Sequence, residues 1–353
     1  MRHMGRMSSA RQRSLIVGMG LSLGALACAL TGTAPIGTPA PAAPPTAAPV
    51  AAETREPTAM SPTRAAAEPF RVVGYVTDWD VVVDEIAFEH LTHLNYAFLV
   101  PDANGTFVGP EHADTLAAVI AAAHAHGVKV LISVGGWGWD EAFEALASQP
   151  PARAHFVADL LAYVDSYDLD GVDLDWEYPG PALGSADSYT HLMTELANGL
   201  HARGKLLTAA VVASGDLAEG VQADVFEVVD FLNVMAYDGP DTNHSSLAYA
   251  EKALAYWRGR GVPPEKLVLG VPFYSRPQEV AYRDLLAADP AAADQDTITY
   301  QGAAVYYNGR PTLAAKVALA RREASGVMIW ALPQDDPGPL SLLAAMATAV
   351  AAP

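Results

Sequence analysis

The sequence predicts an α/β protein, a (β/α)8 TIM barrel with a small insertion after its seventh strand. Three observations support this fold class. Apolar runs of strand length alternate with amphipathic stretches of helical length, the runs are almost continuously apolar, and eight such units fit in about 280 residues. An open, doubly wound sheet is the alternative. The first run is not followed by a phosphate-type glycine loop, which makes the open sheet the less favoured choice.

The expected elements alternate along the chain. The strands are Val72–Val76, Thr92–Leu99, Val128–Val134, Gly171–Glu177, Leu206–Val212, Phe231–Tyr237, Leu267–Phe273 and Val327–Leu332. The helices are Ala113–His126, Arg153–Tyr167, Ala186–Arg203, Ser246–Arg260 and Thr312–Glu323. One unit is irregular, because residues 277–311 separate the seventh strand from the next clear helix. Its segments Thr297–Tyr300 and Val305–Tyr307 fit a hairpin that ends at Asn308-Gly309, either as one wall of a cleft or as surface decoration.

The N-terminal part has a different composition from the barrel. Four arginines precede an uncharged apolar run within residues 1–30, as in an export signal peptide. A membrane anchor is the alternative, but the run is shorter than the roughly 20 apolar residues that a span needs. Residues 31–69 are rich in Ala, Pro and Thr and are predicted to form an extended linker. The barrel domain is expected to occupy residues 70–353.

Cys28 is the only cysteine and lies at the end of the apolar run, in Ala25-Leu26-Ala27-Cys28. This position resembles the lipidation site of bacterial lipoproteins, although Ala25 replaces the usual aliphatic residue. The alternative is a thiol that is discarded with the signal peptide. We therefore expect a secreted or envelope-anchored protein, attached to a membrane only through a lipid on Cys28, and a mature fold without disulfides.

The charge balance excludes two classes of partner. Forty acidic residues against 21 basic ones give a net charge of -19, which repels nucleic acids and anionic membrane surfaces. A neutral polymer such as a polysaccharide feels no such repulsion. The ten histidines show no metal-ligand spacing, so we expect no metal and no cofactor.

Three acidic residues alternate along the fourth expected strand. Asp173, Asp175 and Glu177 lie two residues apart, so their side chains share one face at spacings of roughly 6.5 Å, with apolar residues on the other face. Carboxyl groups this close cannot all ionise cheaply, and at least one pKa is raised. Glu177, at the C-terminal end of its strand, is placed to act as a general acid. A divalent-cation site is the alternative, but the spacing differs from that of an EF-hand loop.

Residues 170–179, DGVDLDWEYP, resemble the catalytic pattern Asp-Gly-x-x-Asp-x-Asp-x-Glu of the family-18 glycoside hydrolases, the chitinase family. Other segments resemble the signatures of the remaining strands in the same order. They are Gly74-Tyr75, Leu91–Phe98, Ser133–Gly136, Met235–Asp238, Gly270–Tyr274 and Val327–Trp330. The resemblance covers about residues 70–350 and implies the barrel fold.

The resemblance also implies a retaining mechanism in which the substrate supplies the nucleophile. Glu177 would protonate the leaving oxygen while the 2-acetamido oxygen of the sugar attacks the anomeric carbon. Asp175 would accept a hydrogen bond from the acetamido N–H. Asp173 would share a proton with Asp175, supported by Tyr75 and Ser133.

Further residues are assigned to the substrate by the same resemblance. Tyr237 would donate a hydrogen bond to the acetamido carbonyl, Asp238 would contact the same sugar, and Trp330 would form the floor beneath it. The other expected substrate-binding residues are Gly136, Trp137 and Met235. Asp170 is out of phase with the acidic row and is expected to be a structural hydrogen-bond partner. Of the remaining tryptophans, Trp79 and Trp139 either bind sugar or cap the barrel, and Trp176 and Trp257 are expected to pack in the core.

The expected activity is therefore hydrolysis of β-1,4 bonds that follow N-acetylglucosamine in chitin or chitin oligomers, by a monomer. One alternative is an endo-β-N-acetylglucosaminidase that acts on N-glycans or peptidoglycan. A chitin-binding lectin on the same barrel is less favoured, because such lectins typically lack the catalytic acid and Glu177 is present.

Overall fold

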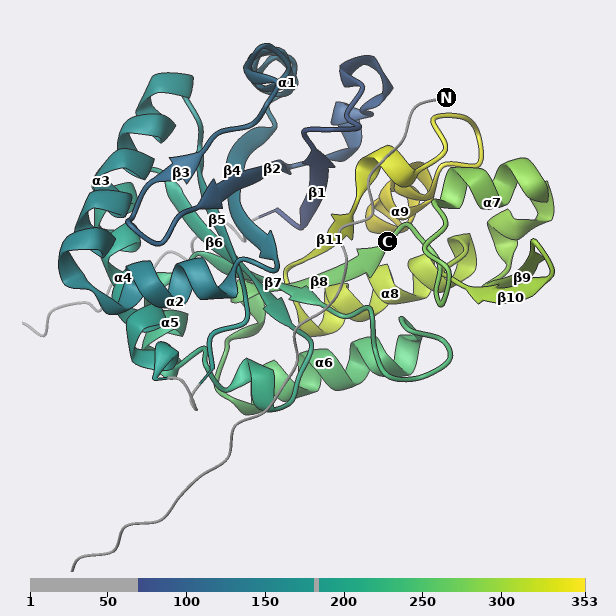
Figure 1. Ribbon diagram of the computed structural model, residues 1–353. Coiled ribbons are helices and arrows are strands. Elements are labelled where there is room, and N and C mark those ends of the chain that lie inside the picture. The colour runs from purple at the N-terminus through teal and green to yellow at the C-terminus, as the bar shows by residue number, and fades with distance from the viewer. Residues whose placement is uncertain (1–68, 181–183, 353) are drawn as a thin grey trace, which may run out of the picture. The chain divides into compact units, whose positions relative to one another are not determined.

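The computed structural model describes residues 69–180 and 184–352 (Figure 1). The predicted signal segment 1–30, its Cys28 and the predicted linker up to residue 68 lie outside the described residues, so these features stay predictions. In the part of the chain that is described, no helix combines the length and the apolar character needed to cross a membrane.

Eight parallel strands close into a barrel. They are β1 (Arg71–Thr77), β2 (His93–Pro101), β4 (Lys129–Trp137), β5 (Gly171–Glu177), β6 (Leu206–Val212), β7 (Phe231–Met235), β8 (Leu267–Pro272) and β11 (Gly326–Trp330). Each strand pairs in parallel with its neighbours, and β1 closes the ring by pairing with both β2 and β11. A short strand, β3 (Phe107–Val108), pairs antiparallel with β2 at the barrel rim. The predicted (β/α)8 barrel is confirmed, and the open sheet is excluded.

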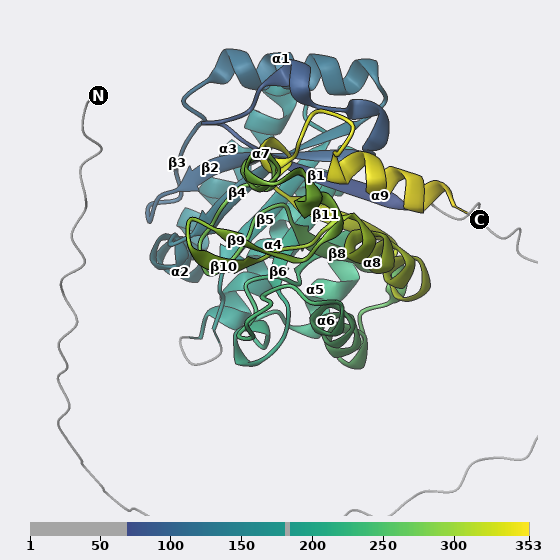
Figure 2. The same ribbon diagram turned by 90° about the vertical axis from the view of Figure 1, so that its right-hand side faces the viewer.

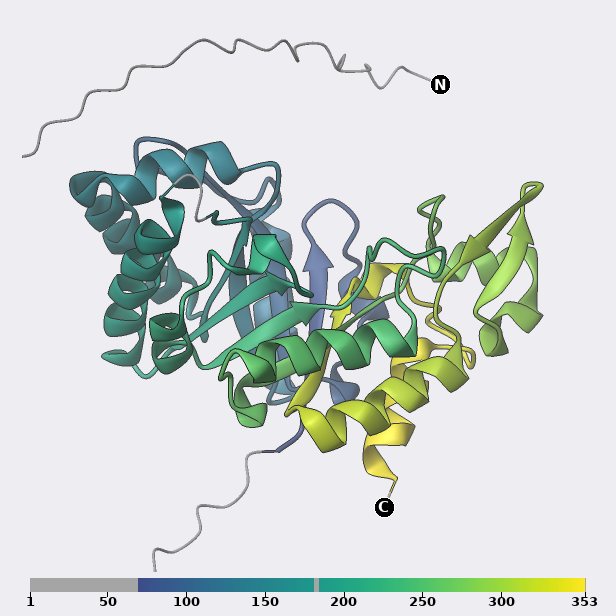
Figure 3. The ribbon, with the colours of Figure 1, turned by 90° about the horizontal axis from the view of Figure 1, so that it is seen from below.

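Helices surround the barrel (Figures 1 and 3). The five predicted helices correspond to α1 (Ala113–Ala125), α3 (Pro150–Tyr167), α4 (Ser185–His201), α6 (Leu247–Gly259) and α8 (Arg310–Glu323). The sequence analysis missed α2 (Asp140–Ser148), α5 (Ala223–Val228), α7 (Tyr282–Ala288) and α9 (Leu342–Ala351). All four are shorter than the window over which a helical period is recognised, and α9 is in addition so rich in alanine that its polar and apolar faces differ little.

The hydrophobic core has two layers because successive residues of each strand face opposite sides. On β5, the apolar residues Val172, Leu174 and Trp176 face the helices, and the Trp176 ring stacks on Phe143 of α2 at 5.0 Å. Trp257 of α6 is fully buried in the same layer, so both tryptophans pack in the core as predicted. The other face of each strand points into the barrel, where the carboxyl row of β5 lies.

The insertion after β8 contains α7 and a hairpin of β9 (Thr297–Tyr300) and β10 (Ala303–Tyr306), which lies beside the barrel in Figure 1 and in front of it in Figure 2. The predicted hairpin exists, but its turn is Gln301-Gly302 and its second strand ends before Asn308. Both turn residues have positive φ, 49° and 85°, as a two-residue type I′ turn requires. The backbone of Tyr306 exchanges two hydrogen bonds with Arg276, which joins the hairpin to the chain that follows β8.

Candidate active site

The carboxyl row of β5 leads from the barrel interior into an open cleft. Asp173 and Asp175 are 0% and 4% exposed, and Glu177 ends the strand at the C-terminal face of the barrel. Asp175 and Glu177 line a cleft of about 1590 Å³ that is formed by segments following the barrel strands. The period of two thus gives one strand both an apolar outer face and an acidic inner face.

Asp173 is the innermost carboxyl of this row, and four hydrogen bonds hold it in place. Its Oδ2 atom accepts hydrogen bonds from the Tyr75 hydroxyl at 2.6 Å and the Ser133 hydroxyl at 2.9 Å. Its Oδ1 atom accepts from the Thr208 hydroxyl at 2.6 Å and the Asn233 amide at 3.1 Å. Burial raises the pKa of Asp173, and these hydrogen bonds oppose the rise. Among the described residues no hydrogen bond joins Asp173 to Asp175, so the proton shared between them stays a prediction.

Thr208 and Asn233 were missed in the sequence analysis. Each is a polar residue in an otherwise apolar strand, Thr208 in β6 and Asn233 in β7, and each is fully buried. A buried polar side chain needs a partner, so an isolated polar residue at an inward position of a barrel strand is a usable signal. The two strands bring both groups to the same carboxylate.

Asp175 and Glu177 are electrostatically linked. Burial raises the pKa of Asp175 well above its usual range, and the charges of Glu177 and Asp173 add to the rise. Burial also raises the pKa of Glu177, while a hydrogen bond from Tyr178 opposes the rise and the charge of Asp238 adds to it. The Oδ1 atom of Asp175 is buried and has no hydrogen-bond partner among the described residues. The pair can therefore hold a proton at its inner end and present a proton donor to the cleft.

Tyr237 and Asp238 follow β7 after Ala236 and line the same cleft, together with Met235 at the end of that strand. Asp238 has a left-handed backbone, with φ 53°, and is held by partners that the sequence analysis did not identify. The Tyr274 hydroxyl donates to it at 2.8 Å, and the Arg276 guanidinium donates to both of its oxygens at 2.7 and 3.0 Å. Burial favours the neutral carboxyl, but hydrogen bonds from His244, Arg276 and Tyr274 outweigh it and hold the pKa of Asp238 well below its usual range.

Trp330 ends β11 and faces the cleft, not the helical layer. Its ring packs edge-on against Tyr75 at 5.4 Å and stacks with Phe98 at 5.8 Å, so its orientation is fixed by two aromatic neighbours. An aromatic face held in this way offers a flat apolar surface in the same cleft as Glu177.

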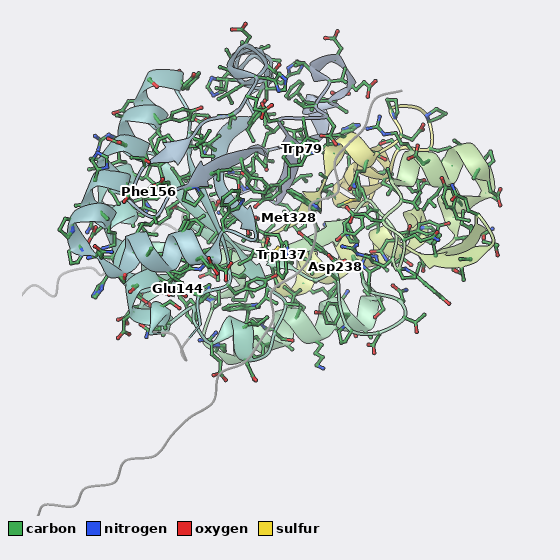
Figure 4. The ribbon with its side chains drawn as sticks, viewed as in Figure 1. Trp79, Trp137, Glu144, Phe156, Asp238 and Met328 are labelled. Carbon is green, nitrogen blue, oxygen red and sulfur yellow. The ribbon has the colours of Figure 1, made fainter. Side chains whose placement is uncertain are left out.

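Exposed apolar side chains are concentrated at the cleft. The described residues include six large hydrophobic residues that are exposed, and five of them line it. These five are Trp79, Val108, Trp137, Trp139 and Leu217. Figure 4 shows Trp79, Trp137 and Asp238 around the centre of the molecule, over the ends of the barrel strands. Exposed apolar side chains gathered in one cleft are typical of a binding site.

Gly136 lines the cleft but is needed for backbone reasons. Its φ is 89°, and a Cβ atom there would lie 2.9 Å from the Phe98 ring. The glycine thus lets Phe98, and with it Trp330, approach β4. Asp170 lies at the other end of β5, where it binds the His124 ring and the Val130 N–H, both at 2.8 Å. Asp170 therefore links β5 to α1 and β4, away from the cleft.

Comparisons with known proteins agree with this geometry. The family model "Glycosyl hydrolases family 18" matches residues 71–335. The chain is 30% identical to the endochitinase of Manduca sexta over 58% of its own length and 45% of that protein. It is 29% identical to chitinase C of Streptomyces lividans over 58% of its own length and 43% of that protein. The chain thus spans less than half the length of these two relatives.

Solved structures resemble the barrel over nearly their whole length. A family-18 chitinase, ChiB, of Flavobacterium johnsoniae superposes with a TM-score of 0.71 and 32% identity, covering 80% of this chain and 94% of that one. A chitinase of Bacteroides thetaiotaomicron superposes with a TM-score of 0.71 and 28% identity, covering 80% and 97%. The fold, the carboxyl row and the extent of the family match together show that this chain belongs to the glycosyl hydrolases of family 18.

Proposed function

We propose that this protein is a chitinase-type glycoside hydrolase that cleaves β-1,4 bonds following N-acetylglucosamine in chitin or chitin oligomers. The observation that carries the proposal is the position of Glu177, whose raised pKa and cleft location suit a general acid, with Asp175 and Asp173 behind it. The exposed apolar side chains of the cleft support a polysaccharide substrate, because the C–H faces of sugars pack on aromatic rings. The named chitinases among the relatives support the choice of polymer.

In the proposed mechanism the substrate provides its own nucleophile. The acetamido carbonyl oxygen forms a bond to the anomeric carbon as the glycosidic C–O bond breaks, and Glu177 transfers its proton to the departing oxygen. Glu177, now a carboxylate, takes a proton from the water that opens the cyclic intermediate, so the anomeric configuration is retained. The unpartnered Oδ1 of Asp175 marks an acceptor that the acetamido N–H or the proton of Glu177 satisfies during the reaction.

The pH dependence of this mechanism tests the electrostatics of the site. Asp238→Asn is expected to shift the basic limb of kcat/KM to lower pH by roughly half a unit, since Asp238 is partly exposed and its field is screened. That limb reports the group that must be protonated in the free enzyme. The charge of Asp238 raises the pKa of Glu177, so its removal lets Glu177 lose its proton at a lower pH. The freed charge of Arg276 acts in the same direction.

The measurement is kcat/KM against pH on a chromogenic N-acetylglucosamine oligomer. Asp241→Asn is the matched control, because Asp241 lines the same cleft but is not among the groups that shift the pKa of Glu177. A shift to higher pH in Asp238→Asn, or an equal shift in both variants, would contradict the assignment of Glu177 as the acid.

Product analysis tests which polymer is the substrate. The protein is incubated in parallel with chitin oligomers, an N-glycopeptide and peptidoglycan, and the products are identified by mass spectrometry, with Glu177→Gln as the control for contaminating enzymes. We expect shorter N-acetylglucosamine oligomers from chitin oligomers alone. Release of glycan only from the glycopeptide, or of fragments only from peptidoglycan, would instead assign an endo-β-N-acetylglucosaminidase. Binding to chitin without any product would assign a lectin.

The location of the protein is proposed from the sequence alone. We propose export through residues 1–30 and, on the position of Cys28, attachment of the mature protein to the cell envelope through a lipid, with the barrel acting as a monomer. Mass spectrometry of the mature N-terminus distinguishes a lipidated Cys28 from a signal peptide that is removed completely.

A further inference from the structure

A fully buried lysine lies outside the site described above. Lys316 of α8 is 0% exposed, and its Nζ atom donates three hydrogen bonds of 2.7 Å, to the Ser245 backbone oxygen, the Ser245 Oγ atom and the Asn308 Oδ1 atom. An ammonium group has three N–H donors and no acceptor, so the three oxygens use all of its donors. Each acceptor is neutral.

Packing alone does not explain this lysine. Burial lowers the pKa of the Lys316 amine to about 7, and the charge of Asp296 only partly opposes this. Burying a cation among neutral groups costs stability, whereas an apolar side chain of similar length fills the same space at no such cost. The reason for a lysine here therefore lies in the groups that it joins.

Ser245, the first residue that Lys316 binds, closes the loop that follows β7. The Ser245 hydroxyl donates to the Ala236 backbone oxygen at 2.8 Å, and within the loop the Gly239 N–H donates to the His244 backbone oxygen at 2.9 Å. Residues 236–245 thus form a closed loop whose two ends meet at Ser245. We call these residues the β7 loop.

The β7 loop carries Tyr237 and Asp238, which line the cleft. Tyr237 directly follows Ala236, whose carbonyl is held by Ser245, and Asp238 lies 3.2 Å from the ring of His244, the neighbour of Ser245. A displacement of Ser245 is therefore transmitted to both Tyr237 and Asp238 through short, hydrogen-bonded connections.

Asn308, the second residue that Lys316 binds, belongs to the insertion. Asn308 follows β10, is buried, and donates from Nδ2 to the Ser245 backbone oxygen at 2.8 Å while its Oδ1 accepts from Lys316. In the same segment Tyr306 lines the cleft and pairs with Arg276, which binds Asp238. Lys316, together with the direct hydrogen bond from Asn308 to Ser245, therefore joins the β7 loop to the insertion, and both of these segments line the cleft.

We propose that Lys316 is a positioning residue: by joining Ser245 to Asn308 it holds the β7 loop against the insertion and so fixes Tyr237 and Asp238 towards the substrate. This inference rests on the proposed function, in which these two residues contact the N-acetylated sugar at the cleaved bond. Their placement matters most as the acetamido oxygen attacks, so loss of Lys316 acts on kcat. The exposed apolar side chains elsewhere in the cleft keep their positions, so KM changes little.

The test compares Lys316→Met with Leu313→Ala, a buried core residue of the same helix. Lys316→Met is expected to lower kcat on chitin oligomers about tenfold, with KM within about twofold and a melting temperature near that of the wild type. Leu313→Ala is expected to lower the melting temperature and to leave kcat within about twofold. Ser245→Ala, which removes one acceptor of Lys316 and the bond to Ala236, provides a milder second variant with the same pattern.

A double-mutant cycle decides whether Lys316 acts through the cleft. In a Tyr237→Phe background, Lys316→Met is expected to lower kcat by far less than tenfold, because the Tyr237 hydroxyl that Lys316 helps to position is already absent. Fold-losses in kcat that multiply would overturn the proposal, as would a kcat in Lys316→Met within twofold of the wild type.

Amide hydrogen exchange of residues 236–245 gives a readout that does not depend on turnover. Exchange in the β7 loop is expected to be faster in Lys316→Met and in Ser245→Ala than in the wild type, and unchanged in Leu313→Ala. If the wild type cleaves none of the substrates, the proposed function fails while this readout still decides on Lys316. Unchanged exchange in Lys316→Met would overturn the positioning role.

Discussion

Glu177→Gln is expected to lower kcat on chitin oligomers by roughly 10²- to 10⁴-fold, the range that a single general acid–base contributes. Glutamine has nearly the shape of the protonated carboxyl but has no proton that it can give to the leaving oxygen or take back from water. Because the side chain ends β5 at the cleft and not in the core, the melting temperature and the affinity for oligomers should stay close to wild type.

Glu144→Gln is a matched control for this experiment. Glu144 lies on α2, and burial raises its pKa as it does that of Glu177, but it does not line the cleft. Figure 4 shows it away from Trp137 and Asp238. The same chemical change at Glu144 should leave kcat unchanged within about twofold. Turnover in Glu177→Gln within tenfold of the wild type, with folding intact, would remove the central assignment of the site.

The barrel could be predicted from the sequence because each of its strands is a local pattern. A run such as Val72–Val76 is apolar throughout, which a strand covered on both faces requires. The acidic row of β5 is also local, since the period of two alone places Asp173, Asp175 and Glu177 on one face. The fold and the acidic strand could therefore be predicted without knowledge of long-range contacts.

The partners of those residues could be predicted only in part. Thr208 and Asn233 are polar residues in apolar strands, a local signal that points into the barrel but does not say which group they meet. Arg276 meets Asp238 across 38 residues of chain, and Lys316 meets Ser245 across 71. These contacts are set by the paths of the β7 loop and the insertion, and no period in the sequence encodes the path of a loop.

The N-acetyl group of the substrate is expected to be essential for turnover. If the acetamido oxygen is the nucleophile, the sugar on the non-reducing side of the cleaved bond must be N-acetylated. A glucosamine there lacks the carbonyl oxygen, and its ammonium group places a positive charge where the positive charge of the intermediate develops. Both effects act in the transition state, so kcat collapses and KM changes far less.

The other carboxyl groups of the row are poorly suited to replace the acetamido oxygen as the nucleophile. Asp175 is buried and its pKa is raised well above its usual range, which favours the protonated carboxyl, a poor nucleophile. Asp173 lies further inside the barrel, and its two carboxylate oxygens accept four hydrogen bonds. Neither group is therefore placed to attack the anomeric carbon in the absence of the acetamido group. A stable thiazoline analogue of the cyclic intermediate should accordingly inhibit far more tightly than the free sugar.

Partly deacetylated chitosan gives the measurement. After digestion, the new reducing ends are identified by mass spectrometry, with total acid hydrolysis of the same polymer as the control for its composition. We expect N-acetylglucosamine at nearly every new reducing end, whatever the acetylated fraction of the polymer. A large share of unacetylated glucosamine at those ends would show that cleavage proceeds without the acetamido group. In that case Asp175, the carboxyl next to Glu177 in the row, would have to be the nucleophile, and the bound substrate would have to reverse the rise in its pKa.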